Sequence, residues 1–193
     1  MIEPFILNWT GPYRWPKGGR QSRIDALEYG GVYLLSVEYN GGYLVYAAGH
    51  TSHFWKRFRQ HDRLYRNGTY TIFDHNAFTA GERVKIWPGF WMRKVRPPEL
   101  VEEYSRRATE IEAARERWLG GYRVFVARTD VDRRLRQRIE ASLMSAFMTA
   151  EPPVCNMPDT GMSLAPRWPW EAPFSVVNVV TRQIWGLPSS FEA

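Results

Sequence analysis

Apolar residues dominate two short stretches of the chain that are separated by a polar turn. Residues 32–38 and 43–48 are rich in β-branched and aromatic side chains, a composition typical of strands. Between them, Asn40-Gly41-Gly42 accepts the positive φ angles that a tight turn requires. We therefore predict a β-hairpin over this part of the chain.

The apolar period then changes from that of a strand to that of a helix. At about 100° per residue, Phe54 and Phe58 fall on one side of a helix that runs to about residue 61. Arg57 and His61, four residues apart, fall together on the edge of this apolar stripe. A side chain at such an edge is neither fully buried nor free in solvent, so it is well placed for a functional site.

The same two periods predict the remaining elements. Apolar residues recur at helical spacing after Pro98 until Gly120-Gly121 ends the pattern, and again after Asp130 up to about residue 148. The further strand candidates are residues 84–87, 122–128 and 174–180.

These elements predict a single α/β (α+β) domain over residues 1–193, with a small, mostly antiparallel three-stranded sheet flanked by helices. Residues 1–22 are rich in Pro, Gly and Trp and are expected to be irregular, within an N-terminal arm that comprises residues 1–30. Residues 62–121 are expected to be a large insertion, and residues 150–193 a C-terminal extension.

Composition narrows the class of partner. The chain has 193 residues, a formal net charge of +6 and a sequence pI near 9.6. A basic balance favours polyanions, although it does not separate DNA from RNA or from an anionic membrane. The 9 Trp, 10 Tyr and 10 Phe can fill a core and can also stack on nucleobases.

The sequence also disfavours a disulfide-stabilised, zinc-binding, secreted or membrane-spanning protein. Cys155 is the only cysteine, so an intrachain disulfide and a cysteine-rich zinc site are excluded. The His50-x-x-His53 pair has no acidic or cysteine ligand near it in sequence, so we interpret it as incidental. No signal peptide is recognisable and no apolar run reaches the length of a membrane helix. A cytoplasmic protein without a membrane partner is expected.

The order strand, strand, helix, strand, helix carries a specific set of residues. They are Gly31-Val32-Tyr33 in the first strand, Ala47-Ala48-Gly49 in the second, and Thr51, Arg57 and His61 at two, eight and twelve positions beyond Gly49. This arrangement resembles the GIY-YIG nuclease superfamily. The resemblance covers the hairpin, the first helix, and the later strand and helix up to Met148, about half of the chain.

The resemblance implies a role for each matching residue. Tyr33, with His61, would activate water, and Arg57 would hold the scissile phosphate. Glu140, on the helix after the third strand, would bind Mg²⁺ or Mn²⁺. Asn156 would match the family's late asparagine, which orients a loop or the substrate.

One position departs from the family pattern. Where the family has a second tyrosine, two residues before Gly49, this chain has Ala47, and Tyr46 stands one place earlier. Adjacent strand residues point to opposite faces, so Tyr46 takes that role only if a β-bulge redirects it.

The expected function is therefore metal-dependent endonuclease activity on DNA, in a setting of restriction or phage defence. Cutting both strands would call for a homodimer or for sequential nicking. The basic residues expected to contact DNA are Lys56, Arg59, Arg63, Arg66, Arg93 and Lys94.

Two alternatives remain open. A nucleic-acid-binding protein that kept the scaffold and lost cleavage would explain Ala47. An enzyme that acts on a small molecule in the same pocket would use the aromatic insertion as a lid.

Overall fold

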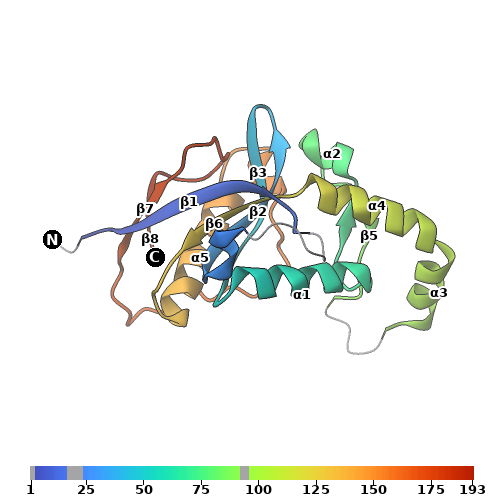
Figure 1. Ribbon diagram of the computed structural model, residues 1–193, viewed down its shortest axis with the longest axis horizontal. Coiled ribbons are helices and arrows are strands. Elements are labelled where there is room, and N and C mark those ends of the chain that lie inside the picture. Colours follow the sequence, from blue (N-terminus) through green and yellow to red (C-terminus); the bar gives the residue numbers. More distant parts are fainter. Residues whose placement is uncertain (1–2, 17–23, 92–95) are drawn as a thin grey trace.

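A six-stranded mixed sheet, curled into a half-barrel, organises the chain (Figure 1). The computed structural model describes residues 3–16, 24–91 and 96–193. The elements are β1 (Phe5–Arg14), η1 (Asp25–Glu28), β2 (Gly31–Tyr39), β3 (Gly42–Thr51), α1 (Phe54–Arg66), β4 (Ile72–Phe73), α2 (His75–Thr79), β5 (Lys85–Trp87), α3 (Pro98–Arg106), α4 (Ala108–Gly121), β6 (Arg123–Arg128), α5 (Arg133–Met148), η2 (Val154–Asn156), β7 (Ser175–Val179) and β8 (Ser190–Glu192). The η elements are short 3-10 helices.

The strand order is β3-β2-β6-β1-β7-β8, with β4 and β5 forming a separate two-stranded sheet. Neighbouring strands of the large sheet are antiparallel except β1 and β7, which are parallel. The predicted hairpin is confirmed as β2 and β3, and Asn40 and Gly41 have positive φ angles of 42° and 72° at its turn. β3 is an edge strand, so its outer side is available to other elements.

Alternate residues of β2 and β6 supply two hydrophobic cores, one on each face of the sheet. Tyr33, Leu35 and Val37 of β2 belong to the core that α1 and α4 complete. Val32 and Leu34 of the same strand belong to the core that α5 completes. This is the period-two pattern of a strand buried on both faces.

The sheet is larger than the three strands predicted. β2, β3 and β6 form the expected antiparallel unit, but β1, β7 and β8 extend it to six. The irregular arm was a wrong prediction for residues 5–14, which form β1 between β6 and β7. Its partners lie far along the chain, so no local pattern revealed the pairing. Residues 17–23 of the predicted arm lie outside the described residues.

The predicted insertion completes a core that it shares with the sheet. Phe73, Phe78 and Trp118 lie in the same hydrophobic cluster as Tyr33. The single helix predicted after Pro98 is two helices, α3 and α4, because Arg107 leaves the helical conformation between them. The short strand predicted at residues 84–87 is confirmed as β5, and the one at 174–180 as β7.

The helices were compared with the length and hydropathy of a membrane span. None of those in the described part of the chain has the length and apolar character needed to cross a bilayer.

Candidate active site

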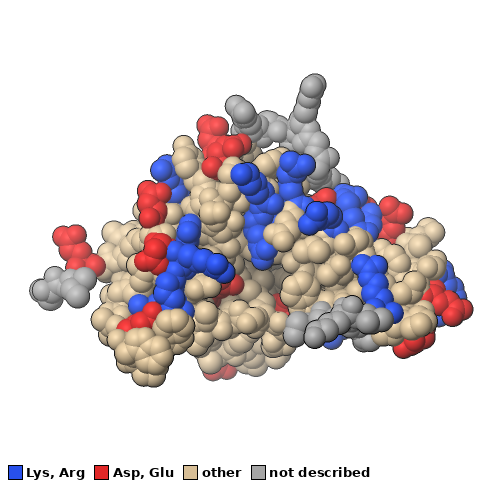
Figure 2. Space-filling model, turned by 90° about the horizontal axis from the view of Figure 1, so that it is seen from below, with Lys and Arg blue, Asp and Glu red and all other residues tan. Residues whose placement is uncertain are grey.

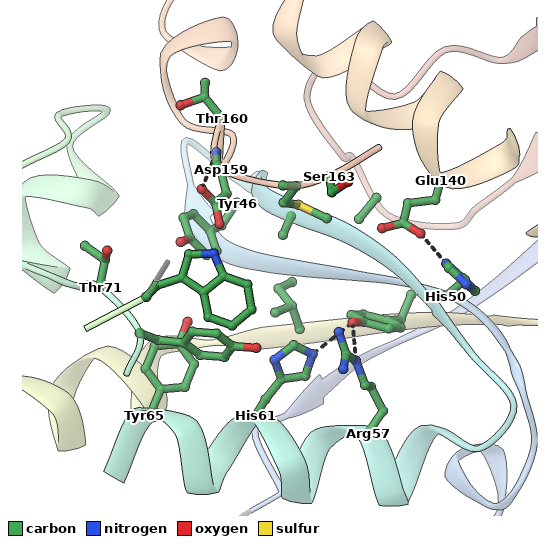
Figure 3. Close-up of a pocket in the computed structure, with 18 of the residues that line it drawn as sticks. Tyr46, His50, Arg57, His61, Tyr65, Thr71, Glu140, Asp159, Thr160 and Ser163 are labelled. Atoms are coloured by element: carbon green, nitrogen blue, oxygen red, sulfur yellow. Dashed lines mark hydrogen bonds and ion pairs between the residues drawn. The ribbon is translucent and has the colours of Figure 1, made fainter. Parts of the chain in front are cut away.

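A cavity of about 680 Å³ lies along the edge strand β3. α1 and the loop of residues 159–163 lie on opposite sides of it, and Glu140 of α5 lies at one end with His50 (Figure 3). Four cationic side chains line the cavity, Arg57, Arg83, Lys85 and Arg133, against two carboxylates, Glu140 and Asp159. The excess of positive charge favours an anionic ligand.

Three of the predicted site residues meet in one hydrogen-bonded group. The hydroxyl of Tyr33, on β2, lies 2.9 Å from His61 Nε2, on α1. Arg57, one helical turn before His61, donates from Nε to the same hydroxyl over 3.3 Å. The four-residue spacing of the sequence thus brings a cation and an imidazole onto one phenol.

Burial sets the protonation of this group. It raises the pKa of Tyr33 to about 12, with Arg57 opposing the shift. Burial, and then the charge of Arg57, lowers the pKa of His61 to about 3, so the imidazole is neutral at physiological pH. The buried phenol needs an acceptor for its proton, and neutral His61 supplies one. We therefore assign Tyr33 as donor to His61 and as acceptor from Arg57.

The depressed pKa of His61 predicts a pH-dependent stability. The unfolded chain, with an ordinary imidazole pKa near 6.5, binds a proton that the folded chain excludes down to about pH 3. Stability should therefore fall as the pH is lowered from 6.5 towards 3, by up to about 1.4 kcal/mol per pH unit. The free energy of unfolding, measured with urea at several pH values, should fall less steeply with decreasing pH for His61→Gln than for the wild type. Equal slopes in both proteins would contradict the burial of a neutral imidazole.

Gly49 has a steric reason to be glycine. It pairs with Tyr33 across the hairpin, and the tyrosine ring lies over it. A Cβ on Gly49 would fall 2.3 Å from both Cζ and the hydroxyl oxygen of Tyr33, closer than any non-bonded contact. The glycine of the motif therefore keeps the space that the phenol occupies.

We accordingly expect Gly49→Ala to destabilise the protein by about 1–3 kcal/mol, because the ring or the strand must move. The matched control is Gly120→Ala in α4, where an added Cβ meets nothing within 4 Å. The control should be neutral or more stable by up to about 1 kcal/mol, since alanine favours helix. Equal urea midpoints for Gly49→Ala and the wild type would show that the ring does not depend on this space.

Tyr46 lies in the β-bulge on which its role depended. Leu35 pairs with Ala47 while Ser36 pairs with Val45, which leaves Tyr46 as the extra residue of β3. Its carbonyl accepts a hydrogen bond from the Asp159 N–H over 2.8 Å instead of from the ladder. Both Tyr46 and Ala47 consequently line the cavity.

The hydroxyl environment of Tyr46 differs from that of Tyr33. Burial raises its pKa well above the ordinary value, and Tyr65 and the Asp159 carboxylate raise it further. Tyr46 lies beside Asp159, across the cavity from Arg57 (Figure 3). Tyr46 therefore shares the cavity without joining the Tyr33 group.

Glu140, predicted as the metal ligand, lies on the cavity wall and pairs with Nδ1 of His50. Burial is the largest cause of the raised pKa of Tyr33, Arg57 opposes the shift, and the negative charge of Glu140 adds a smaller rise. Glu140 and the Tyr33 group therefore share one electrostatic environment. The His50-x-x-His53 pair was interpreted as incidental because no acidic residue lies near it in sequence, and α5 brings one to His50 from ninety residues away.

The donor set around Glu140 fits one kind of metal site. Within the described ranges, no group of three or more His, Cys, Asp or Glu converges in a way that could enclose an ion. Mg²⁺ is commonly held by one or two carboxylates, with water and substrate phosphate completing its shell. Glu140 can serve such a site, but not an all-protein cage.

The other predicted residues lie elsewhere. Asn156 is exposed at the end of η2 and does not line the cavity. The α1 residues predicted to contact DNA are exposed, and Figure 2 shows Lys and Arg gathering over the face of the molecule that α1 forms. The predicted α1 residues are Lys56, Arg59, Arg63 and Arg66. Of these, Arg66 is paired with Asp62 and Glu116. Arg93 and Lys94 lie outside the described residues.

Comparisons of this chain with family models, with curated proteins and with solved structures found no match. The site is therefore interpreted from its own geometry.

The cavity wall also includes residues that the sequence did not single out. The insertion contributes Tyr70, Thr71, Arg83, Lys85 and Trp91, and the C-terminal loop contributes Asp159 to Ser163. The aromatic and basic character of the insertion is the signal behind its expected role as a lid or a DNA contact, whereas no local pattern indicated the loop.

Proposed function

We propose that this protein is a metal-dependent endonuclease that hydrolyses phosphodiester bonds of DNA. The observation that supports this most is that Tyr33, Arg57, His61 and Glu140, from three separate elements, line one positively charged cavity. The phenol, guanidinium and imidazole are hydrogen-bonded to one another, and the carboxylate contributes to their electrostatics.

In this mechanism Arg57 binds the scissile phosphate and offsets the charge that develops on it. Its guanidinium already donates to Tyr33 through Nε and to Gln60 Oε1 through one terminal nitrogen. Its remaining N–H groups are the ones available to a phosphate oxygen.

Tyr33 moves the proton of the attacking water. A phenol with a pKa of about 12 is a hydrogen-bond donor at neutral pH, so it accepts a proton from water only as it passes its own to His61. Burial and, after it, the charge of Arg57 lower the pKa of His61. A bound phosphate offsets the charge of Arg57 and so removes the smaller of these two causes, while burial remains. The hydroxide forms a bond to phosphorus, the bond from phosphorus to the leaving oxygen breaks, and that oxygen keeps the electron pair and takes up a proton from solvent.

Glu140 would hold the metal, and His50 would orient its carboxylate. A bound Mg²⁺ or Mn²⁺ would lower the pKa of water and stabilise charge on the phosphate.

The bulge at Tyr46 weakens the argument for a binding protein without catalysis. That alternative was motivated by Ala47, and the bulge supplies a second phenol to the cavity from the neighbouring position. The enclosing insertion favours a second candidate, an enzyme for a small phosphate ester. This candidate predicts little affinity for DNA at physiological salt, whereas a DNA enzyme loses affinity steeply as salt increases.

The test is incubation of the protein with supercoiled plasmid in Mg²⁺, in Mn²⁺ and in EDTA. We expect nicked or linear product with either metal and none in EDTA. Cleavage that persists in EDTA, or intact plasmid in both metals, would falsify the proposal.

A further inference from the structure

The cavity is larger than a phosphodiester requires. Its volume of about 680 Å³ lies within the range of roughly 300–1,000 Å³ that is typical of sites for whole organic ligands. The phosphate-directed groups, Arg57, His61 and Glu140, occupy one part of it (Figure 3). The insertion and the loop of residues 159–165 supply most of the remaining wall, and the hydrolytic mechanism gives these residues no role.

Aromatic rings continue from the catalytic group into this second part. The ring centroids of His61 and Tyr70 are 5.5 Å apart, and those of Tyr70 and Trp91 are also 5.5 Å apart. Trp91 is 50% exposed, although its backbone N–H is fixed to the Thr69 carbonyl over 2.9 Å. A half-exposed indole on a held backbone offers a ready surface for a planar ligand.

A hydrogen-bond donor and a hydrogen-bond acceptor lie in the cavity with these rings. Arg83 lines the cavity, donates to the Pro158 carbonyl over 2.7 Å and packs against Phe73. Its buried Nε has no hydrogen-bond partner within the described part of the chain. Asp159, on the facing loop, adds a carboxylate acceptor. A planar ligand with donors and acceptors on its edge would find a donor in the guanidinium of Arg83 and an acceptor in Asp159.

We infer that this part of the cavity binds one unpaired nucleobase of the DNA strand, stacked on Trp91 and in contact with Tyr70 next to the scissile phosphate. The base of an intact duplex is stacked between its neighbours and cannot enter such a site. The preferred substrate is therefore a single-stranded or extrahelical nucleotide. This inference rests on the proposed function in taking DNA as the ligand.

The test compares two ligands of equal charge in EDTA, so that binding is measured without cleavage. One is a short single-stranded oligodeoxynucleotide, and the other is the same backbone with tetrahydrofuran in place of every base. The wild type should bind the base-bearing strand about tenfold or more tightly, because stacking adds to the same phosphate contacts. The ratio of the affinity for the base-bearing strand to that for the abasic strand should fall most of the way to one in Trp91→Ala, with the affinity for the abasic strand unchanged. Trp91→Phe should retain part of the ratio.

The matched control is Trp170→Ala, because Trp170 is 78% exposed and does not line the cavity. It should leave the ratio as in the wild type. A ratio near one in the wild type, or equal losses on both ligands in Trp91→Ala, overturns the inference. If the plasmid is not cleaved but the preference for the base-bearing strand still depends on Trp91, the proposed nuclease activity is refuted and the base-binding site is supported. In an active enzyme, a fully paired duplex should be cut more slowly than the same duplex with an unpaired nucleotide.

Discussion

Glu140→Gln is expected to reduce metal-dependent cleavage of DNA by roughly a hundredfold or more. Glutamine keeps the shape of the side chain and can still hydrogen-bond to His50, so the wall of the cavity should be preserved. It removes the negative charge that a hard cation requires of its protein ligand. The measurement is the initial rate of plasmid nicking over a range of Mg²⁺ concentrations.

The control for this change is Glu151→Gln, which removes a carboxylate from an exposed position shortly after α5. It should cleave at the wild-type rate. If Glu140→Gln also cleaved at that rate, and with the same dependence on Mg²⁺, the metal would have to bind elsewhere. The pairing of Glu140 with His50 would then be purely structural.

The hairpin and the residues of α1 could be predicted because their determinants are local. The turn depends on Asn40 and Gly41, and the meeting of Arg57 with His61 depends only on the helical period. Their joint contact with Tyr33 could be expected only through the family resemblance, because it depends on how α1 packs on β2.

Other parts of the site depend on register and on distant segments. A bulge at Tyr46 adds one residue to one strand, and no composition rule indicates where that residue falls. The late loop was expected to bring Asn156 to the site, but the residues that line the cavity begin at Asp159, three residues farther along. Loop geometry follows from tertiary contacts, here the hydrogen bond from Asp159 to the bulge at Tyr46.

Tyr33→Phe is expected to lower the rate of cleavage by about 10²- to 10⁴-fold, the usual contribution of a positioned proton-transfer group. Phenylalanine keeps the ring against Phe54 and Phe58, whose centroids lie 6.4 and 5.2 Å away, so the hairpin and α1 should remain packed. The buried His61 Nε2 loses its partner, which should cost about 1–3 kcal/mol of stability.

The control must remove a buried phenol at similar cost without touching the proton path. Tyr122→Phe does so, because its hydroxyl is fully buried, bonds to the Tyr65 hydroxyl over 2.6 Å and does not line the cavity. A comparable loss of stability with full activity in Tyr122→Phe would separate chemistry from folding. If Tyr33→Phe were equally active, the hydroxyl would serve only to hold Arg57 and His61 in place, and water would need another base. Neutral His61 would then be the nearest one, since its pKa of about 3 leaves it unprotonated at the near-neutral pH of a cleavage assay.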